Sequence, residues 1–238
     1  MHNESSDTAR KSTNASTISV KFELIAAILV KTRDDLIKQI AQVKPYLKTV
    51  QIDIMDNDFV PNKTIGLAEL KDLPDGVKYE FHWMVQNPEN WIISMKHVKN
   101  ALHLVHVEAK MDFEKVRQAV KAVGGKLAIA FNPETPVDRL FAYANETNYF
   151  LAMTVHPGFS GQKYITAVED KIKALRECYP YYDIEIDGGI NVDTIKRAVA
   201  AGANKIVAAS AIFGQKDISL AIKKLQKAAA EGPAYASN

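Results

Sequence analysis

The fold is most constrained by an alternation of two kinds of segment, which begins near residue 19 and continues to about residue 230. Short apolar runs alternate with longer segments in which apolar residues recur with the period of a helix. Eight such pairs can be counted along the chain. Repeated βα units of this kind build a parallel sheet with helices packed against it.

We expect strands at residues 20–30, 49–54, 77–85, 102–108, 127–131, 149–155, 184–187 and 205–209, and helices at residues 34–46, 67–73, 88–98, 112–123, 137–145, 164–178, 192–201 and 218–230. Eight βα units in 238 residues predict a single (β/α)8 barrel, the TIM barrel, with parallel strands, and a doubly wound open sheet is the alternative fold. In such a barrel, functional groups come from the C-terminal ends of the strands and from the loops that follow them.

The composition of the chain indicates where its folded domain begins and which partners it can bind. Residues 1–18 are polar and rich in Ser, Thr and Asn, which predicts a disordered N-terminal tail before a barrel domain at residues 19–238. A net charge of only +2, with no long run of either sign, argues against a nucleic-acid partner.

The chain has neither a membrane-length apolar stretch nor an apolar signal sequence, so we expect a cytoplasmic protein. Its single cysteine, Cys178, excludes an internal disulfide and a cysteine zinc cluster. Exposed barrel helices commonly support assembly, and a homo-oligomer is therefore left open.

Two aspartates stand at the ends of expected core strands. Asp53 comes near the end of the second strand and Asp187 at the end of the seventh. An unpaired buried charge costs several kcal/mol, so such a residue usually meets a metal, a substrate or a proton, unless it only caps a turn. His82 lies near the end of the third strand, where a lone histidine would more often be a hydrogen-bonded core residue. With the two aspartates, it instead makes a plausible set of ligands for a divalent metal ion.

Six segments, in order along the chain, carry a specific resemblance. They are residues 51–62 (QIDIMDNDFVPN), 82–89 (HWMVQNPE), 132–136 (NPETP), 153–162 (MTVHPGFSGQ), 186–190 (IDGGI) and 209–213 (ASAIF). Together they resemble successive signatures of the ribulose-phosphate 3-epimerase family. The resemblance implies a barrel enzyme of the pentose phosphate pathway that interconverts D-ribulose 5-phosphate and D-xylulose 5-phosphate with one divalent metal ion, which could be Zn, Fe, Mn or Co.

The resemblance also implies roles for individual residues. Asp53 and Asp187 match the acid/base pair, which inverts C3 through an enediolate by removing a proton on one face and returning one on the other. Both aspartates and His82 match metal ligands. The residues that match the substrate site are Met55, Met84 and Met153 along its wall and, for phosphate, Gly158, Gly161, Gly188, Gly189, Ala209 and Ser210.

Several positions depart from the family pattern. Gln51 stands where the family has its first metal histidine, and Ala27 stands where it has a serine that contacts substrate. His156 replaces a glutamate and is an additional candidate for contact with substrate, while Ala209 and Asn57 replace glycines. Left-handed backbone is well tolerated by asparagine, so the change at residue 57 is expected to be structurally neutral.

These departures leave two alternatives open. One is an epimerase for a six-carbon ketose phosphate such as allulose 6-phosphate, and the other is a non-catalytic sugar-phosphate-binding relative. Barrel decarboxylases and synthases are disfavoured, because their Asp-x-Lys motif would require a lysine where Met55 stands.

Overall fold

The computed structural model describes residues 21–232, and the tail predicted at residues 1–18 lies outside them. Eight parallel strands follow one another around a closed barrel, in which β8 pairs with β1. The strands are β1 (Glu23–Ile28), β2 (Thr49–Met55), β3 (Lys78–Met84), β4 (Leu102–His106), β5 (Lys126–Phe131), β6 (Tyr149–Met153), β7 (Asp183–Asp187) and β8 (Lys205–Ala208). The predicted barrel is confirmed, and closure excludes the open sheet.

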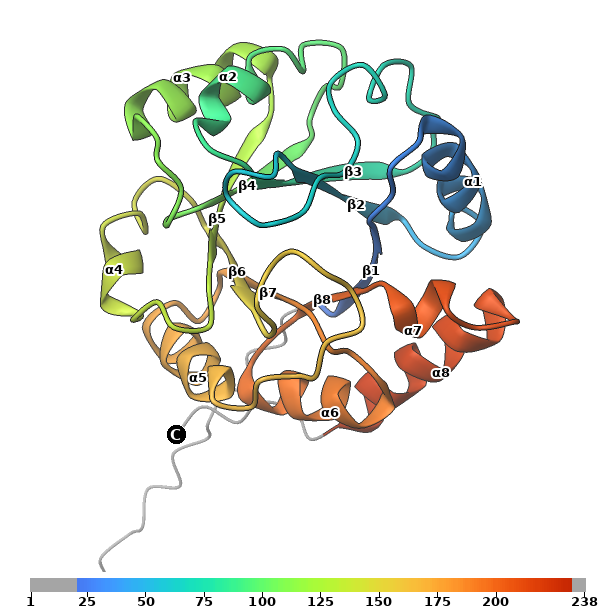
Figure 1. The fold of residues 1–238 in the computed structure, drawn as a ribbon. Helices are drawn as coiled ribbons and strands as arrows, with labels where there is room; N and C mark the ends of the chain where they lie inside the picture. Colours follow the sequence, from blue (N-terminus) through green and yellow to red (C-terminus); the bar gives the residue numbers. More distant parts are fainter. Residues whose placement is uncertain (1–20, 233–238) are drawn as a thin grey trace, which may run out of the picture.

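Helices surround the barrel as an outer ring (Figure 1). They are α1 (Arg33–Val43), α2 (Pro88–Ile92), α3 (Phe113–Val123), α4 (Asp138–Phe141), α5 (Val168–Cys178), α6 (Val192–Ala201), α7 (Ser210–Phe213) and α8 (Ile218–Glu231). The short α7 was not predicted, and α2, α4 and α5 are shorter than predicted. Within residues 21–232, no helix is both long enough and apolar enough to cross a membrane.

The predicted helix at residues 67–73 is wrong, because this segment forms only turns. The guanidinium of Arg33 explains why. It donates hydrogen bonds to the carbonyl oxygens of Glu69 at 2.7 Å and of Asp72 at 3.1 Å, and to that of Lys71. Asp72 is also held in the left-handed region, with φ of 47°. These carbonyls are therefore used to anchor the segment to the start of α1 and not to extend a helix.

The barrel interior contains two layers of polar side chains, because alternate residues of each strand point inward. The lower layer, at the N-terminal end, includes Glu23, whose carboxylate lies 2.7 Å from Lys205 Nζ. It also includes Glu80, Tyr149 and Glu185, all of which are buried. Two residues further along β3 and β7, the inward positions are His82 and Asp187. The layer that holds His82 and Asp187 thus lies directly above a second layer of buried polar side chains.

Candidate active site

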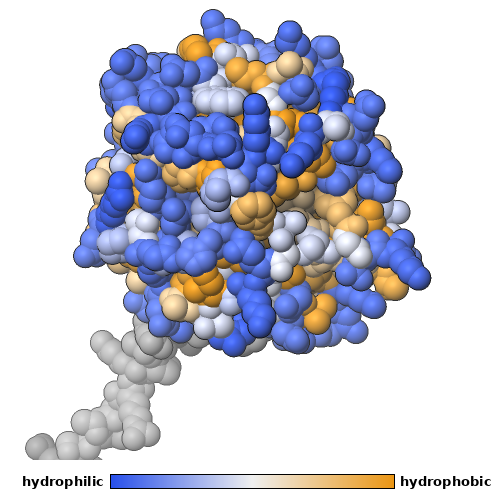
Figure 2. All heavy atoms as spheres, in the orientation of Figure 1, coloured by the Kyte–Doolittle hydropathy of each residue, from blue (hydrophilic) through white to orange (hydrophobic). Residues whose placement is uncertain are grey.

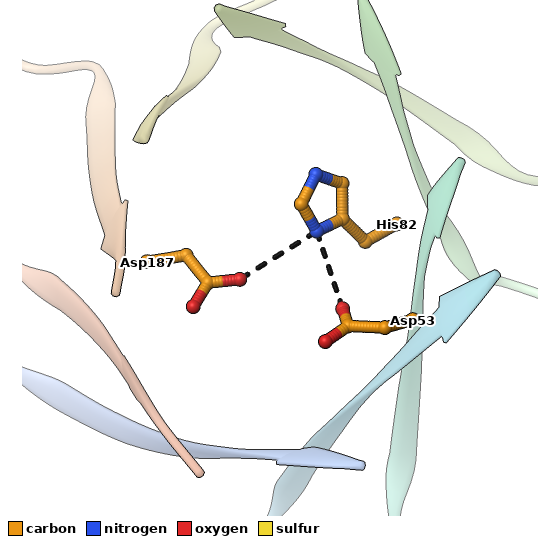
Figure 3. Close-up of side chains that lie close together, drawn as sticks. All are labelled: Asp53, His82 and Asp187. Atoms are coloured by element: carbon orange, nitrogen blue, oxygen red, sulfur yellow. Dashed lines mark hydrogen bonds and ion pairs between the residues drawn. The ribbon is translucent and has the colours of Figure 1, made fainter. Parts of the chain in front are cut away.

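Three predicted metal ligands meet inside the barrel. Asp53 on β2 and His82 on β3 are direct partners in the strand register, and Asp187 approaches from β7 (Figure 3). His82 Nδ1 lies 3.2 Å from Asp53 Oδ1 and 3.5 Å from Asp187 Oδ2. His82 is fully buried, and the two carboxylates are largely so. The structure therefore brings together two carboxylates and an imidazole that are separated by up to 134 residues in the chain, from position 53 to position 187.

Gln51 lies among these groups, one inward position below Asp53 on β2. Its Nε2 donates to Asp53 Oδ1 at 3.0 Å and to Asp187 Oδ2 at 2.7 Å, while its buried Oε1 has no hydrogen-bond partner. The two ends of an amide have nearly the same shape, so a half-turn of this amide would place Oε1 where Nε2 lies. An oxygen there suits a cation, which would satisfy this orphaned acceptor.

The donor set fits a divalent metal ion. Asp53, His82 and Asp187 each offer one ligand atom, and these atoms lie within 4.8 Å of one another. Two carboxylate oxygens and an imidazole nitrogen are a common set for such ions, with Gln51 Oε1 as a possible fourth, weaker ligand.

The electrostatics of the site show how strongly these groups interact. Burial alone would lower the pKa of His82, but hydrogen bonds and charge interactions with Asp187 and Asp53 raise it to about 9. Burial raises the pKa of Asp53, and the negative charge of Asp187 raises it further, against the opposing effect of His82. Two carboxylates at this separation need positive charge or donors between them. The imidazolium of His82 and the amide of Gln51 supply these.

Two functional candidates were missed by the sequence analysis. His106 Nε2 lies 2.8 Å from His82 Nε2, and His106 Nδ1 lies 3.1 Å from Glu108 Oε2. Burial tends to raise the pKa of Glu108, but its interactions with His106 and further hydrogen bonds lower it to about 2. A signal was available, since His106-Val-Glu108 stands at the end of an expected strand with two polar residues at alternate positions.

A pocket opens above the three ligands and contains most of the predicted substrate residues. It is lined by Asp53 and Asp187 together with Met55, Met84, Met153, Gly158, Gly161, Gly188, Gly189, Ala209 and Ser210. Ala27, where the family has serine, also lines it. In Figure 2, hydrophobic atoms gather near the middle of this face within a mostly hydrophilic surround.

His156 is placed differently from these residues. It is not among the residues that line the pocket, its side chain is 63% exposed, and its Nδ1 lies 3.4 Å from Glu134 Oε1 on the outer surface.

Glycines allow the backbone to pack closely around the pocket. Gly189 has φ of 65°, and a Cβ there would lie 2.5 Å from the backbone nitrogen of Tyr164. Gly188, with φ of 119°, is equally close to the side chain of Val155. Asn57 has φ of 67°, so this residue does adopt the left-handed backbone that asparagine tolerates. The two glycines after β7 therefore bring main chain to the edge of the pocket, where N–H groups suit an anion.

Two segments lie across the mouth of the barrel in Figure 1, one after β2 and one after β6. They are joined by a hydrogen bond of 2.6 Å from Asn62 Nδ2 to the carbonyl oxygen of Gly158. The second segment is tied to itself, since Gln162 Nε2 donates to the carbonyl oxygens of His156 and Phe159. The free volume beneath is about 50 Å³, room for a few water molecules. The two segments therefore leave only a narrow pocket beneath them.

Solved structures with similar folds share the barrel at low sequence identity. A 3-hexulose-6-phosphate synthase from Salmonella typhimurium has a TM-score of 0.66 at 14% identity, over 89% of this chain and all of that one. An orotidine 5'-phosphate decarboxylase from Pyrococcus horikoshii has a TM-score of 0.63 at 16% identity, over 87% of this chain and 99% of that one. At such identities the likeness supports the fold alone.

Sequence relatives are more specific. The chain is 38% identical to the cytoplasmic isoform of ribulose-phosphate 3-epimerase from Oryza sativa, over 75% of this chain and 81% of that protein. It is 38% identical to the enzyme of that name from Methanocaldococcus jannaschii, over 76% and 79% of the two chains, and 35% identical to that from Bacillus subtilis, over 74% and 85%. The model of the ribulose-phosphate 3-epimerase family matches residues 21–213. The chain therefore belongs to the ribulose-phosphate 3-epimerase family.

Proposed function

We propose that this protein is a metal-dependent epimerase that interconverts D-ribulose 5-phosphate and D-xylulose 5-phosphate. The observation that carries the proposal is the placement of Asp53 and Asp187, which come from β2 and β7 and line one pocket. Inversion at a carbon next to a ketone needs proton transfer on both faces of that carbon. Two carboxylates that flank one pocket meet this requirement.

The protein residues divide the reaction between them. One aspartate removes the proton from C3, and the other, in its acid form, returns a proton to the opposite face. Asp53, His82 and Asp187 would hold the metal ion, with Gln51 Oε1 as an additional ligand after its amide turns. The chemistry that a divalent ion supplies in such a site is Lewis-acid polarisation of the substrate ketone.

The remaining pocket residues support the same assignment. Met55, Met84 and Met153 form an apolar wall beside the carboxylates, which excludes water from a reactive intermediate. The main chain around Gly188, Gly189 and Ser210 offers N–H groups to a phosphate at the other side of the pocket. Because the pocket has room for only a few water molecules, we expect the segments after β2 and β6 to shift when a ketose phosphate enters.

The proposal is tested by loading the purified protein separately with Zn, Fe, Mn or Co in D2O. NMR then follows deuterium incorporation at C3 and epimerisation of ribulose 5-phosphate, with allulose 6-phosphate as a second substrate. Asp187→Asn is the control, since it keeps the shape of the site but removes one proton carrier. Turnover of only the six-carbon substrate would replace the pentose assignment. Binding of both sugars without exchange, under every metal, would support the binding-only alternative and refute the proposal.

The cytoplasmic location, a possible homo-oligomer and the lack of a nucleic-acid partner stay predictions.

A further inference from the structure

A line of hydrogen bonds leads away from the candidate metal site into the wall of the barrel. It runs from His82 through His106 to Glu108, with donor–acceptor separations of 2.8 Å and 3.1 Å. Both imidazoles are fully buried, and the Glu108 side chain is 18% exposed. Neither His106 nor Glu108 lines the substrate pocket. Their roles must therefore be exerted through His82.

The geometry of the two rings suits a directed hydrogen bond. The ring centroids of His82 and His106 are 5.0 Å apart, and the ring planes differ by only 17°. With the Nε2 atoms 2.8 Å apart, the rings meet edge to edge, so an N–H on one ring points along the lone pair of the other. Phe59 packs on His106 at 4.9 Å between ring centroids, which shields this contact from water.

The direction of each hydrogen bond follows from Glu108. An ionised carboxylate only accepts, so His106 must carry its proton on Nδ1. The Nε2 of a neutral His106 is then an acceptor, and His82 must carry a proton on its own Nε2. Nδ1 of His82, which faces Asp53 and Asp187, is then the nitrogen on which a bound cation would replace the proton of the imidazolium.

Glu108 is itself held in place by donors from the β5–α4 loop. Its Oε1 accepts from the backbone N–H of Asn132 at 3.0 Å and from the hydroxyl of Thr135. Oε1 thus faces two donors, whereas Oε2 faces His106. Because Oε1 is occupied by these donors, Oε2 is the oxygen that accepts the hydrogen bond from His106.

We propose that His106 and Glu108 are positioning residues that fix the tautomer of His82, so that its Nδ1 is presented to the metal ion. The presence of a metal ion in this inference rests on the proposed function. The hydrogen-bonded relay, by which we mean His82, His106 and Glu108, is a property of the protein itself. In other metal sites, partners of this kind hold the ring orientation of a ligating histidine and are worth about 10- to 100-fold in metal affinity.

Glu108→Gln provides a sharp test. The amide oxygen is expected to stay with the two donors at Asn132 and Thr135, which turns the NH2 group toward His106 Nδ1. His106 would then accept at Nδ1 from the glutamine and donate from Nε2 to His82 Nε2. A neutral His82 would therefore carry its proton on Nδ1, which faces the metal site. We expect zinc affinity, measured by calorimetry, to fall about 10- to 100-fold. Glu114→Gln, the same change on the exposed face of α3, should leave zinc affinity unchanged.

A second measurement separates positioning from simple loosening of the loop. NMR of protein labelled with 15N-histidine, recorded above pH 9 where His82 is neutral, reports which nitrogen of His106 carries the proton, and it needs neither metal nor activity. We expect the Nδ1–H form in the wild type and the Nε2–H form in Glu108→Gln. An Nε2–H form in the wild type would overturn the inference, and this readout remains available if Glu108→Gln fails to fold.

The remaining outcomes are also decisive. Weaker zinc binding with an unchanged His106 tautomer would assign the loss to a displaced loop and refute the relay. Absence of epimerase activity in the wild type, with the tautomers as expected, would refute the proposed function but would not contradict the role of His106 and Glu108.

Discussion

Replacing Glu80 with glutamine should stabilise the protein at neutral and alkaline pH. Glu80 and Glu185 are both buried in the floor of the barrel, where the hydroxyl of Tyr149 contacts both carboxyl groups. Each carboxyl has one buried oxygen without a partner, Oε2 of Glu80 and Oε1 of Glu185. Burial raises the pKa of Glu80 from 4.5 to about 8, and the charge of Glu23 contributes in the same direction. At neutral pH the carboxyl group of Glu80 is therefore mostly protonated in the folded protein, and it would ionise if the chain unfolded.

The magnitude follows from linkage between protonation and folding. Because the folded pKa lies above the unfolded one, this group contributes fully to stability below pH 4.5, and the contribution is lost as the pH rises through about 8. Between those limits the free energy of unfolding falls by up to about 5 kcal/mol, and about 3 kcal/mol of this is already lost at pH 7. Glutamine has a similar shape and stays neutral at every pH. The variant should therefore gain about 3 kcal/mol over the wild type at pH 7 and nothing near pH 4.

Urea denaturation, followed by the fluorescence of the buried Trp83, measures this difference at several pH values. The exposed substitution Glu114→Gln controls for a change of net charge. The opposite interpretation is that Glu80 is ionised and held by the nearby charge of Lys205, which acts to lower its pKa. A variant that is less stable than the wild type near pH 9 would establish that interpretation and refute the argument from burial.

Three further predictions concern the site. Gln51→His should tighten zinc binding by about tenfold or more in calorimetry, since imidazole is the better ligand, and equal or weaker binding would contradict this. Asp187→Asn should reduce C3 proton exchange by about 10²- to 10⁴-fold in D2O, whereas an unchanged rate would remove Asp187 from the acid/base pair. Gly189→Ala should destabilise the fold by about 1–3 kcal/mol in thermal denaturation, because its φ is 65° and Cβ would lie 2.5 Å from Tyr164 N; an unchanged melting temperature would show that the loop relaxes freely.

All eight strands were predicted because buried parallel strands are continuous apolar runs that contrast with the amphipathic segments between them. Their ends were less certain: β1 begins at Glu23, three residues later than expected, and β6 ends at Met153, two residues earlier. The helix at residues 67–73 failed for a different reason. Its apolar spacing is helical, but its carbonyls are bound by Arg33, which lies more than 30 residues earlier in the chain. A long-range contact of this kind has no local sequence signature.

The convergence of Asp53, His82 and Asp187 could be predicted because closure of a barrel brings strand ends together. The relay through His106 could have been predicted from the alternate spacing of His106 and Glu108, but its direction could not. That direction depends on which oxygen of Glu108 meets the donors of the β5–α4 loop, and this is a matter of side-chain geometry.

The substitution at Gln51 has two effects of opposite sign on this site. Its Nε2 donates to both Asp53 and Asp187, so this neutral amide holds the two neighbouring carboxylates together with His82. A cation must displace both hydrogen bonds before Gln51 Oε1 can join it, and the free energy of those bonds is subtracted from its affinity. The variant Gln51→His should therefore unfold more easily than the wild type without metal and bind zinc more tightly. If the variant were more stable in both states, the amide would not be the group that holds the carboxylate pair together.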